Sequence, residues 1–261
     1  MEIKTLKLTR FEMDYFTFGS GEKTMVILPG MGLKSVMGSA DEVAADYKIF
    51  DKEYTVYVFD RIKNMPDTYT VFDMAHDTAE AFDRLGLCGI YLFGMSQGGM
   101  MAQVIAARHP SLIEKAVLGS THYRPSEVSD RVFSHWIELS REKDARKTAA
   151  GMIDLIYTKG FLERYRELIL GLYENTTDEE FRRFGIMAKA CLDFDFSDEI
   201  GNIRCPAFVI GAGDDKVMPG NESEETAKAV GCECYIYEGY AHAVCDEAPD
   251  YKERIFDFFE D

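Results

Sequence analysis

The sequence has few basic residues for its size: 29 Lys and Arg stand against 46 Asp and Glu, which gives 261 residues a formal net charge of −17. Phosphate backbones and anionic membrane surfaces repel such a chain, so we expect neither nucleic acid nor a membrane as a partner. No apolar stretch approaches the roughly 20 residues of a membrane span, and residues 1–4 do not begin an apolar signal segment. These absences predict a cytoplasmic protein that meets neutral or cationic small molecules more readily than strongly anionic ones.

Patterns that bind metals or cofactors are also missing. The six cysteines include no Cys-x-x-Cys pair and mostly stand beside apolar residues, at Cys88, Cys191, Cys205, Cys232, Cys234 and Cys245. We therefore expect them to be small buried residues rather than metal ligands or disulfide partners. No metal-ligand spacing and no dinucleotide-binding fingerprint occurs, so the sequence predicts neither a metal nor a cofactor.

Strand and helix patterns alternate through most of the chain. The expected strands are, in order, residues 3–8, 11–18, 25–28, 54–59, 90–93, 116–118, 206–210 and 234–237. The expected helices between and after them are residues 73–85, 97–108, 222–230 and 249–259. Because most of these strands are apolar throughout, the pattern predicts an α/β fold with a mostly parallel central sheet flanked by helices on both faces.

Residues 123–198 interrupt this alternation. They contain no recognisable strand, linker or repeat, but they include helical segments rich in aromatic and charged residues. A strong apolar stripe at helical spacing is formed by Leu162, Tyr165, Leu168, Ile169 and Leu172. We interpret residues 123–198 as a helical cap inserted into one α/β core, which residues 1–122 and 199–261 form together.

The pattern Gly-x-Ser-x-Gly occurs once, with Ser96 at its centre, from Gly94 to Gly98. The pattern alone is a weak signal, because it arises by chance in about one chain in ten of this length. Its position strengthens it, since it follows the predicted strand 90–93 and opens the predicted helix 97–108. A serine in so tight a turn is held with strained backbone angles, and its hydroxyl lies at the positive end of the helix. Ser96 is the predicted nucleophile; a Gly-Ser turn that only packs helix on strand is the alternative.

A serine hydroxyl needs a base, and the base needs an acid that orients it. His242 follows the last predicted strand and precedes the C-terminal helix, so it can lie above the sheet beside Ser96. His122 also follows a strand, but no acid stands near it in the sequence. Asp214 and Asp215 both follow the strand 206–210, and we expect one of them to orient His242.

The chain order of Ser96, an aspartate and His242, with an insertion before the strand of the aspartate, resembles the capped α/β-hydrolase superfamily. The resemblance covers nearly the whole chain outside the cap, and its motifs are specific in combination. It implies Asp215 as the acid, because the acid of that family usually stands four residues before a proline, here Pro219. Asp214 stays the alternative.

The resemblance also implies an oxyanion hole formed by the backbone N–H groups of Met31 and Gln97. The first of these loops departs from the family pattern, because Pro29-Gly30 occupies the place where most relatives have His-Gly. Since the donors are backbone groups, the departure does not remove the hole. Asp60-Arg61 matches the Asp-Arg that ends a strand in the family, and we interpret this pair as structural.

A serine at this position excludes the relatives that use an aspartate there to open epoxides or displace halide. We predict an enzyme, a serine hydrolase that cleaves a small to medium, apolar ester or related acyl compound through an acyl-enzyme. Carbon–carbon bond hydrolysis, cofactor-free perhydrolase chemistry and a ligand-sensing role are alternatives on the same residues. Met95, Trp136 and Met218 are predicted to line an apolar substrate pocket. For the aromatic residues of the cap, packing onto the sheet is the competing explanation.

Overall fold

The computed structural model describes all residues from Met1 to Asp261. Its centre is an eight-stranded sheet with the order β1-β2-β4-β3-β5-β6-β7-β8. The strands are β1 (Lys4–Lys7), β2 (Glu12–Gly19), β3 (Lys23–Leu28), β4 (Tyr54–Ile62), β5 (Ile90–Met95), β6 (Ile113–Gly119), β7 (Ala207–Ala212) and β8 (Glu233–Tyr237). The pairs β1–β2 and β2–β4 are antiparallel, whereas every pair from β4 to β8 is parallel. The predicted mostly parallel sheet is confirmed.

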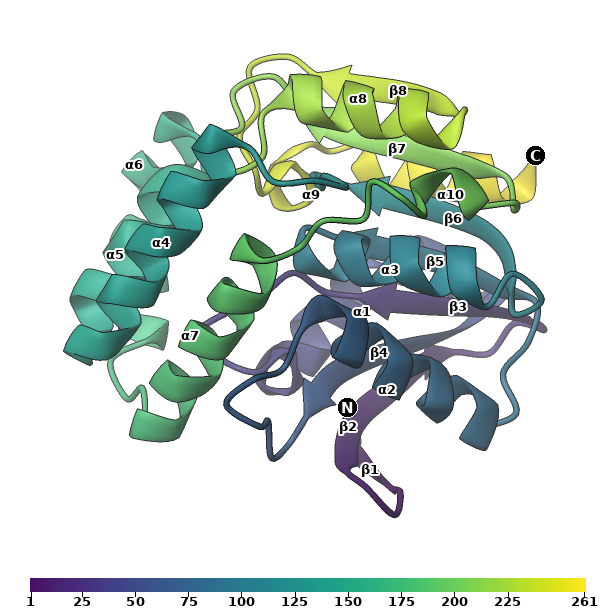
Figure 1. Cartoon of the computed structure of the whole chain (residues 1–261), viewed down its shortest axis with the longest axis horizontal. Helices are drawn as coiled ribbons and strands as arrows, with labels where there is room; N and C mark the ends of the chain where they lie inside the picture. Colours follow the sequence, from purple (N-terminus) through teal and green to yellow (C-terminus); the bar gives the residue numbers. More distant parts are fainter.

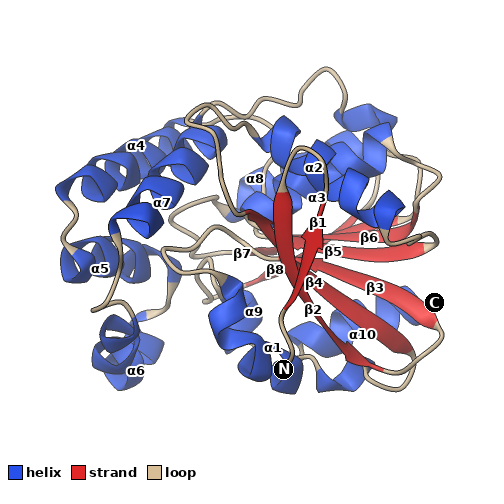
Figure 2. Ribbon diagram, turned by 90° about the horizontal axis from the view of Figure 1, so that it is seen from below, coloured by secondary structure: helices blue, strands red, loops and turns tan.

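Helices cover both faces of the sheet (Figure 2). On one face lie α2 (Val71–Arg84), α3 (Gln97–Arg108) and α8 (Gly220–Val230), whose apolar sides join one buried cluster with the strands. On the other face lie α1 (Ala40–Asp46) and α10 (Tyr251–Glu260), which pack in a second cluster. Burial of apolar side chains on both faces explains why the central strands are apolar throughout.

Four helices, α4 (Glu127–Glu142), α5 (Ala145–Ile156), α6 (Lys159–Leu172) and α7 (Asp178–Leu192), connect β6 to β7 and stand together at one end of the sheet (Figure 1). Their caps explain where they begin. Each starts after a residue whose side chain accepts a hydrogen bond from a backbone N–H of the first turn, namely Ser126, Asp144, Thr158 and Thr177. We call residues 123–198 the helical insertion. No helix of the structure combines the length and the apolar character that crossing a bilayer requires.

The apolar stripe on α6 is only partly covered. Leu168 and Leu172 are each 67% exposed and Tyr165 is 43% exposed, whereas Leu162 and Ile169 pack against a small cluster with α5. Helix α6 lies at the outer side of the insertion, where α5 is its main neighbour. The edge of the stripe that faces α5 is therefore partly buried, and the rest is exposed.

Two short helical segments have no counterpart in the sequence prediction. Helix α1, with 3₁₀ turns on either side, occupies the connection between β3 and β4, and α9 (Val244–Glu247) follows the loop after β8. Each segment spans at most two turns, which is too short for apolar periodicity to become recognisable.

The cysteines follow the expectation only in part. All six are free thiols, and Cys191 and Cys245 are buried, as predicted. Burial raises the pKa of Cys191 to about 12, so this thiol is neutral at physiological pH. The expectation is wrong for Cys88, which is exposed in the turn after α2.

Helix α3 approaches the sheet so closely that Gly98 has no room for a side chain. A Cβ atom there would lie 1.9 Å from the carbonyl oxygen of Leu28 on β3. Because backbone must move to accommodate a methyl group, we expect Gly98→Ala to lower the free energy of unfolding by about 3 kcal/mol. Urea denaturation followed by circular dichroism measures this change.

Gly171→Ala on α6 is the matched control, because a Cβ atom at that position meets nothing within 4 Å. In a helix this substitution gains up to about 1 kcal/mol through the lower entropy of the unfolded chain. Equal stability of the two variants would contradict the close packing of α3 on β3.

Candidate active site

Ser96 occupies the turn between β5 and α3 in a backbone conformation that L-residues rarely adopt, with φ 53° and ψ −120°. Two hydrogen bonds hold it there: its N–H donates to the Gly119 carbonyl at 2.8 Å, and the Thr121 hydroxyl donates to its carbonyl at 2.9 Å. The neighbouring Gly94 leaves room for the turn, since a Cβ atom there would lie 2.3 Å from the Gly98 carbonyl. These angles agree with the strained turn that the motif predicts.

His242 lies between Ser96 and Asp215. Its Nε2 is 2.9 Å from Ser96 Oγ, and its Nδ1 is 2.7 Å from Asp215 Oδ2. Because an ionised carboxylate only accepts hydrogen bonds, Nδ1 carries the proton, and Nε2 accepts the serine hydroxyl. All three residues are about 5% exposed. The arrangement can therefore transfer a proton from Ser96 to His242.

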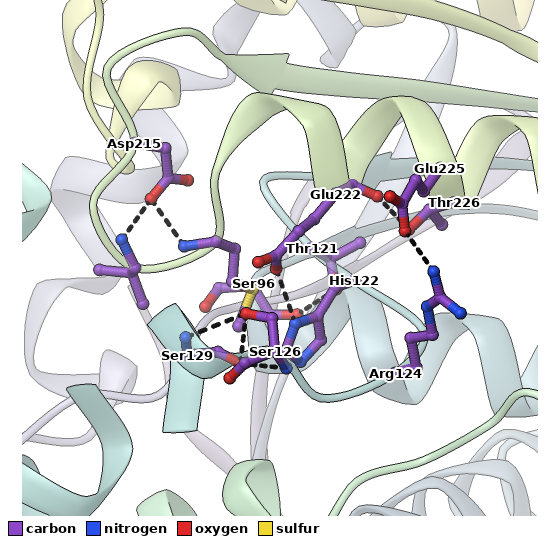
Figure 3. A network of polar contacts seen from close by, with 12 residues as sticks. Ser96, Thr121, His122, Arg124, Ser126, Ser129, Asp215, Glu222, Glu225 and Thr226 are labelled. Carbon is purple, nitrogen blue, oxygen red and sulfur yellow. Dashed lines mark hydrogen bonds and ion pairs between the residues drawn. The ribbon is translucent and has the colours of Figure 1, made fainter. Parts of the chain in front are cut away.

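Asp215, rather than Asp214, has the position of the orienting acid. Its second oxygen, Oδ1, accepts backbone N–H bonds from Val217 at 2.7 Å and Met218 at 2.9 Å, which fix the carboxylate (Figure 3). The side chain of Asp214 is exposed and does not contact His242. The four-residue spacing to Pro219 thus pointed to Asp215, the aspartate that contacts the imidazole of His242 in the structure.

The two backbone donors that the resemblance implies adjoin Ser96. Gln97 is the first residue of α3, so its N–H has no acceptor within the helix. The N–H of Met31 forms no hydrogen bond within the protein. The loop that carries Met31 passes directly beside the serine, because a Cβ atom at Gly30 would lie 3.3 Å from Ser96 Cβ. Pro29 therefore does not keep this loop from approaching Ser96.

A cavity of about 250 Å³ opens at Ser96 and His242. Most of the residues around it are apolar, and two of the predicted pocket residues, Met95 and Trp136, are among them. The helical insertion supplies one wall of the cavity through Trp136 on α4, and Met152 on α5 extends that wall. Apolar walls around a few polar groups are typical of small-molecule sites.

Met218 does not line this cavity, contrary to prediction. Its side chain is completely buried in the main apolar cluster, and its backbone N–H is bonded to Asp215. Its closeness to Asp215 in the sequence correctly predicted that its backbone lies near the acid. Its side chain, however, points into the core.

Tyr157, at the end of α5, is a cavity residue that the sequence analysis missed. Its hydroxyl donates to Asp246 Oδ2 at 2.9 Å, and burial, the largest cause, raises its pKa. The bond joins the insertion to the segment that follows His242. No local signal in the sequence pointed to this contact, because the two residues are 89 positions apart.

The side chain of Gln97, whose backbone N–H was a predicted oxyanion donor, also contacts the helical insertion, which was not predicted. It is completely buried, and its Nε2 donates to the Met187 carbonyl at 2.9 Å and lies 3.1 Å from Cys191 Sγ, both on α7. The residue after Ser96 therefore binds the helical insertion. An amide directly after the predicted nucleophile, in a helix that is mostly apolar, was the available signal.

His122 has an acid partner after all, so the expectation that it lacks one is wrong. Its Nδ1 lies 3.0 Å from Glu222 Oε2, and both side chains are buried (Figure 3). Glu222 belongs to the first turn of α8, one hundred residues along the chain. The neighbouring strands β6 and β7 bring the two loops together, which the sequence pattern could not show without the strand order.

One group of residues has the spacing of a metal site. The ligand atoms of His76, Asp77 and Glu80 lie within 4.8 Å of one another on α2. Arg10, however, donates to Asp77 at 2.9 Å and to Glu80 at 2.5 Å. Its guanidinium already supplies the positive charge that these carboxylates need, so we interpret the group as an ion-pair network.

Comparison with known proteins agrees with this architecture. The "Putative carbamate hydrolase RutD" of Rhizobium rhizogenes is 24% identical over 246 residues, which cover 90% of this chain and 92% of that protein. The crystal structure of MGS-M2, an alpha/beta hydrolase enzyme from a Medee basin deep-sea metagenome library, has a TM-score of 0.88 at 19% identity and covers 99% of this chain and 98% of that one. The enol-lactonase from Burkholderia xenovorans LB400 has a TM-score of 0.83 at 22% identity, covering 99% and 100%.

At these identities the solved structures establish likeness of fold. The family assignment comes from the sequence itself, because the family model described as alpha/beta hydrolase fold matches residues 23–249, most of the chain. This match confirms the predicted superfamily and, at the level of the family, the predicted enzyme class, a hydrolase. The chain belongs to the alpha/beta hydrolase fold family.

Proposed function

We propose that the protein is a serine hydrolase that cleaves small to medium, mostly apolar esters or related acyl compounds, with Ser96, His242 and Asp215 as its catalytic residues. The observation that carries the proposal is the position of His242, whose two ring nitrogens contact the Ser96 hydroxyl and the Asp215 carboxylate at hydrogen-bond distance. Ser96 and His242 line a cavity large enough for a small acyl group.

The reaction follows from these contacts. Ser96 Oγ attacks the substrate carbonyl carbon while His242 Nε2 takes its proton, and Asp215 stabilises the imidazolium that forms. The carbonyl oxygen, now an anion, accepts hydrogen bonds from the N–H groups of Met31 and Gln97. His242 then gives the proton to the leaving oxygen, which leaves an acyl group on Ser96. A water molecule, activated by the same imidazole, releases the acid and restores the serine.

The cavity supports the substrate class. Its apolar walls suit an acyl chain, and its volume of about 250 Å³ favours short to medium chains. Relatives with a similar fold include an enzyme named for lactone opening and one named for carbamate hydrolysis. Both names describe attack on a carbonyl carbon that carries an oxygen or nitrogen leaving group. These names are consistent with acyl hydrolysis, whereas two solved structures of similar fold that are named bromoperoxidase are consistent with the perhydrolase alternative.

We also propose that the helical insertion, residues 123–198, acts as a cap over the core formed by residues 1–122 and 199–261. In support, α4 and α5 supply a wall of the cavity, whereas Ser96 and His242 come from the core. On this proposal the insertion selects the substrate, and the core performs the chemistry.

Ser96 should react with a fluorophosphonate probe near neutral pH and should be required for turnover of p-nitrophenyl acetate. The reason is its contact with an imidazole that can remove its proton. Gel fluorescence and absorbance at the nitrophenolate band measure the two reactions, and Ser96→Ala should abolish both. Ser223→Ala, which removes another buried hydroxyl, should retain both. Folded protein that neither labels nor turns over ester would favour a ligand-sensing role.

Asp215→Asn should lower kcat for p-nitrophenyl acetate by about 10⁴-fold, because the uncharged amide cannot replace the carboxylate in stabilising the protonated imidazole. The variant should fold, since the amide oxygen still accepts the bonds from Val217 and Met218. Asp214→Asn is the control and should change kcat by less than about twofold, because this side chain is exposed. The reverse order of the two effects would transfer the acid role to Asp214.

Trp136 should control acyl-chain preference rather than the chemical step. It lines the cavity and also packs against Phe133 and Phe184, while its Nε1 donates to the Gly151 carbonyl. Trp136→Phe keeps much of this packing but enlarges the cavity. We expect it to change KM and the ratio of hexanoate to acetate turnover, with kcat for the acetate within about threefold of wild type.

Phe133→Leu serves as the control for packing, because Phe133 touches Trp136 but does not line the cavity. A large loss of melting temperature with an unchanged chain-length profile in Trp136→Phe would contradict the selective role of the tryptophan. An equal change of chain-length preference in both variants would contradict it as well.

A further inference from the structure

Arg61, at the end of β4, is a buried cation without an anionic partner. Its side chain is 3% exposed, and no carboxylate oxygen lies within ion-pair distance of its guanidinium. One of its terminal nitrogens, Nη2, donates to the Pro29 carbonyl at 2.7 Å, whereas its Nε is buried and has no partner. Arginine is almost never fully buried unless it is paired.

The neighbouring carboxylate does not neutralise this guanidinium directly. Asp60 accepts the backbone N–H of Arg61, the hydroxyl of Ser35 at 2.6 Å and the guanidinium of Arg183 at 3.4 Å. The bond to Pro29 explains how Arg61 supports the loop beside Ser96, but it uses a single donor of five. The other donors of Arg61 form no hydrogen bond with the protein, and the charge of Asp60 acts on the guanidinium only from beyond ion-pair distance.

Arg61 lines a second chamber of about 360 Å³ that adjoins the Ser96 cavity. The two spaces share the loop of residues 29–31 and Met152 and Ile156 of α5. These shared residues place the chamber of Arg61 directly beside the cavity at Ser96.

The other charged groups of the chamber are already satisfied. Lys34 pairs with Glu180 at 2.9 Å, and Arg183 pairs with Asp60. Asp246, which borders both spaces, is exposed to solvent and accepts the Tyr157 hydroxyl. Arg61 is thus the buried charge of the chamber that lacks a counter-ion.

We propose that Arg61 binds a carboxylate of the substrate, so that the preferred substrates are acyl compounds with an anionic carboxylate on the acyl chain. The inference rests on the proposed hydrolysis at Ser96 and names its substrate class. Guanidinium and carboxylate form short, charge-assisted hydrogen bonds, which are strongest where water is excluded. On this proposal Arg61 has a binding role besides its structural one, and the expected preference for neutral or cationic molecules would not apply inside this chamber.

The test compares matched esters that differ only in the carboxylate. Monoethyl succinate, glutarate and adipate are each paired with the neutral ethyl ester of the same carbon number, butyrate, valerate and hexanoate, and ethanol release is measured. Wild-type protein should prefer at least one anionic ester over its neutral partner by about tenfold or more in kcat/KM, the range of one hydrogen bond to a charged group. Equal values for all three pairs would overturn the inference.

Arg61→Gln should lower kcat/KM for the preferred anionic ester by about tenfold to a hundredfold more than for its neutral partner, which loses only the support of the loop. Arg183→Gln is the matched control, because it removes a cation of the same chamber that is already paired with Asp60. A loss in Arg61→Gln that is equal for anionic and neutral esters would assign Arg61 only to support of the loop.

An experiment on wild-type protein avoids dependence on the folding of the variant. The dicarboxylate matching the preferred ester should inhibit ethyl butyrate hydrolysis competitively, whereas the corresponding diamide should not. Equal inhibition by the two compounds, or none by either, would contradict the carboxylate site. Absence of turnover for every ester would instead contradict the proposed function, so the two failures are distinguishable.

Discussion

The hydrogen bonds from Ser96 N–H to Gly119 and from Thr121 to the Ser96 carbonyl hold a backbone conformation that the serine would not keep alone. Three consequences follow from this turn. Helix α3 must begin immediately, which leaves the Gln97 N–H free. The helix must lie against β3, which excludes a side chain at Gly98. The serine hydroxyl must stand above the sheet, where the ends of the other parallel strands bring His242 and Asp215 to meet it.

Net charge and local charge act over different distances in this protein. The surplus of acidic residues acts through solvent and is screened beyond about 8 to 10 Å at physiological salt. The net charge therefore affects the approach of large polyanions, but it has little effect on the binding of a group inside a buried chamber. There the buried guanidinium of Arg61 has no counter-ion within ion-pair distance, because the nearby carboxylates of Asp60 and Glu180 are paired with other cations. A strongly acidic chain is therefore consistent with the proposed anion-binding chamber, because the surface charges are screened over the distance that separates them from it.

The sequence predicted those features that neighbouring residues determine. The strand, serine and helix of residues 90–108 form one local unit, so the position of Ser96 could be inferred without tertiary information. Asp214 and Asp215 follow the same strand and differ only in the direction of their side chains, which local chemistry does not reveal. The spacing to Pro219 that is usual in the family was needed to choose Asp215. The prediction that Met218 lines the cavity was wrong for the same reason, because the direction of its side chain could not be inferred from the sequence. The pairing of His122 with Glu222 depends on the strand order, which no periodicity encodes.

Gln97 joins the two parts of the molecule that the proposed reaction uses differently. Its backbone N–H belongs to the turn beside Ser96, while its side chain binds the Met187 carbonyl and Cys191 on α7. The side chain is completely buried, so solvent cannot replace these bonds without separating α7 from the core. The insertion that walls the cavity is therefore held to the residue that follows Ser96, and the position of the wall is fixed relative to the serine. This connection gives a physical reason why the proposed cap, although remote in sequence, could select among substrates of the proposed reaction at Ser96.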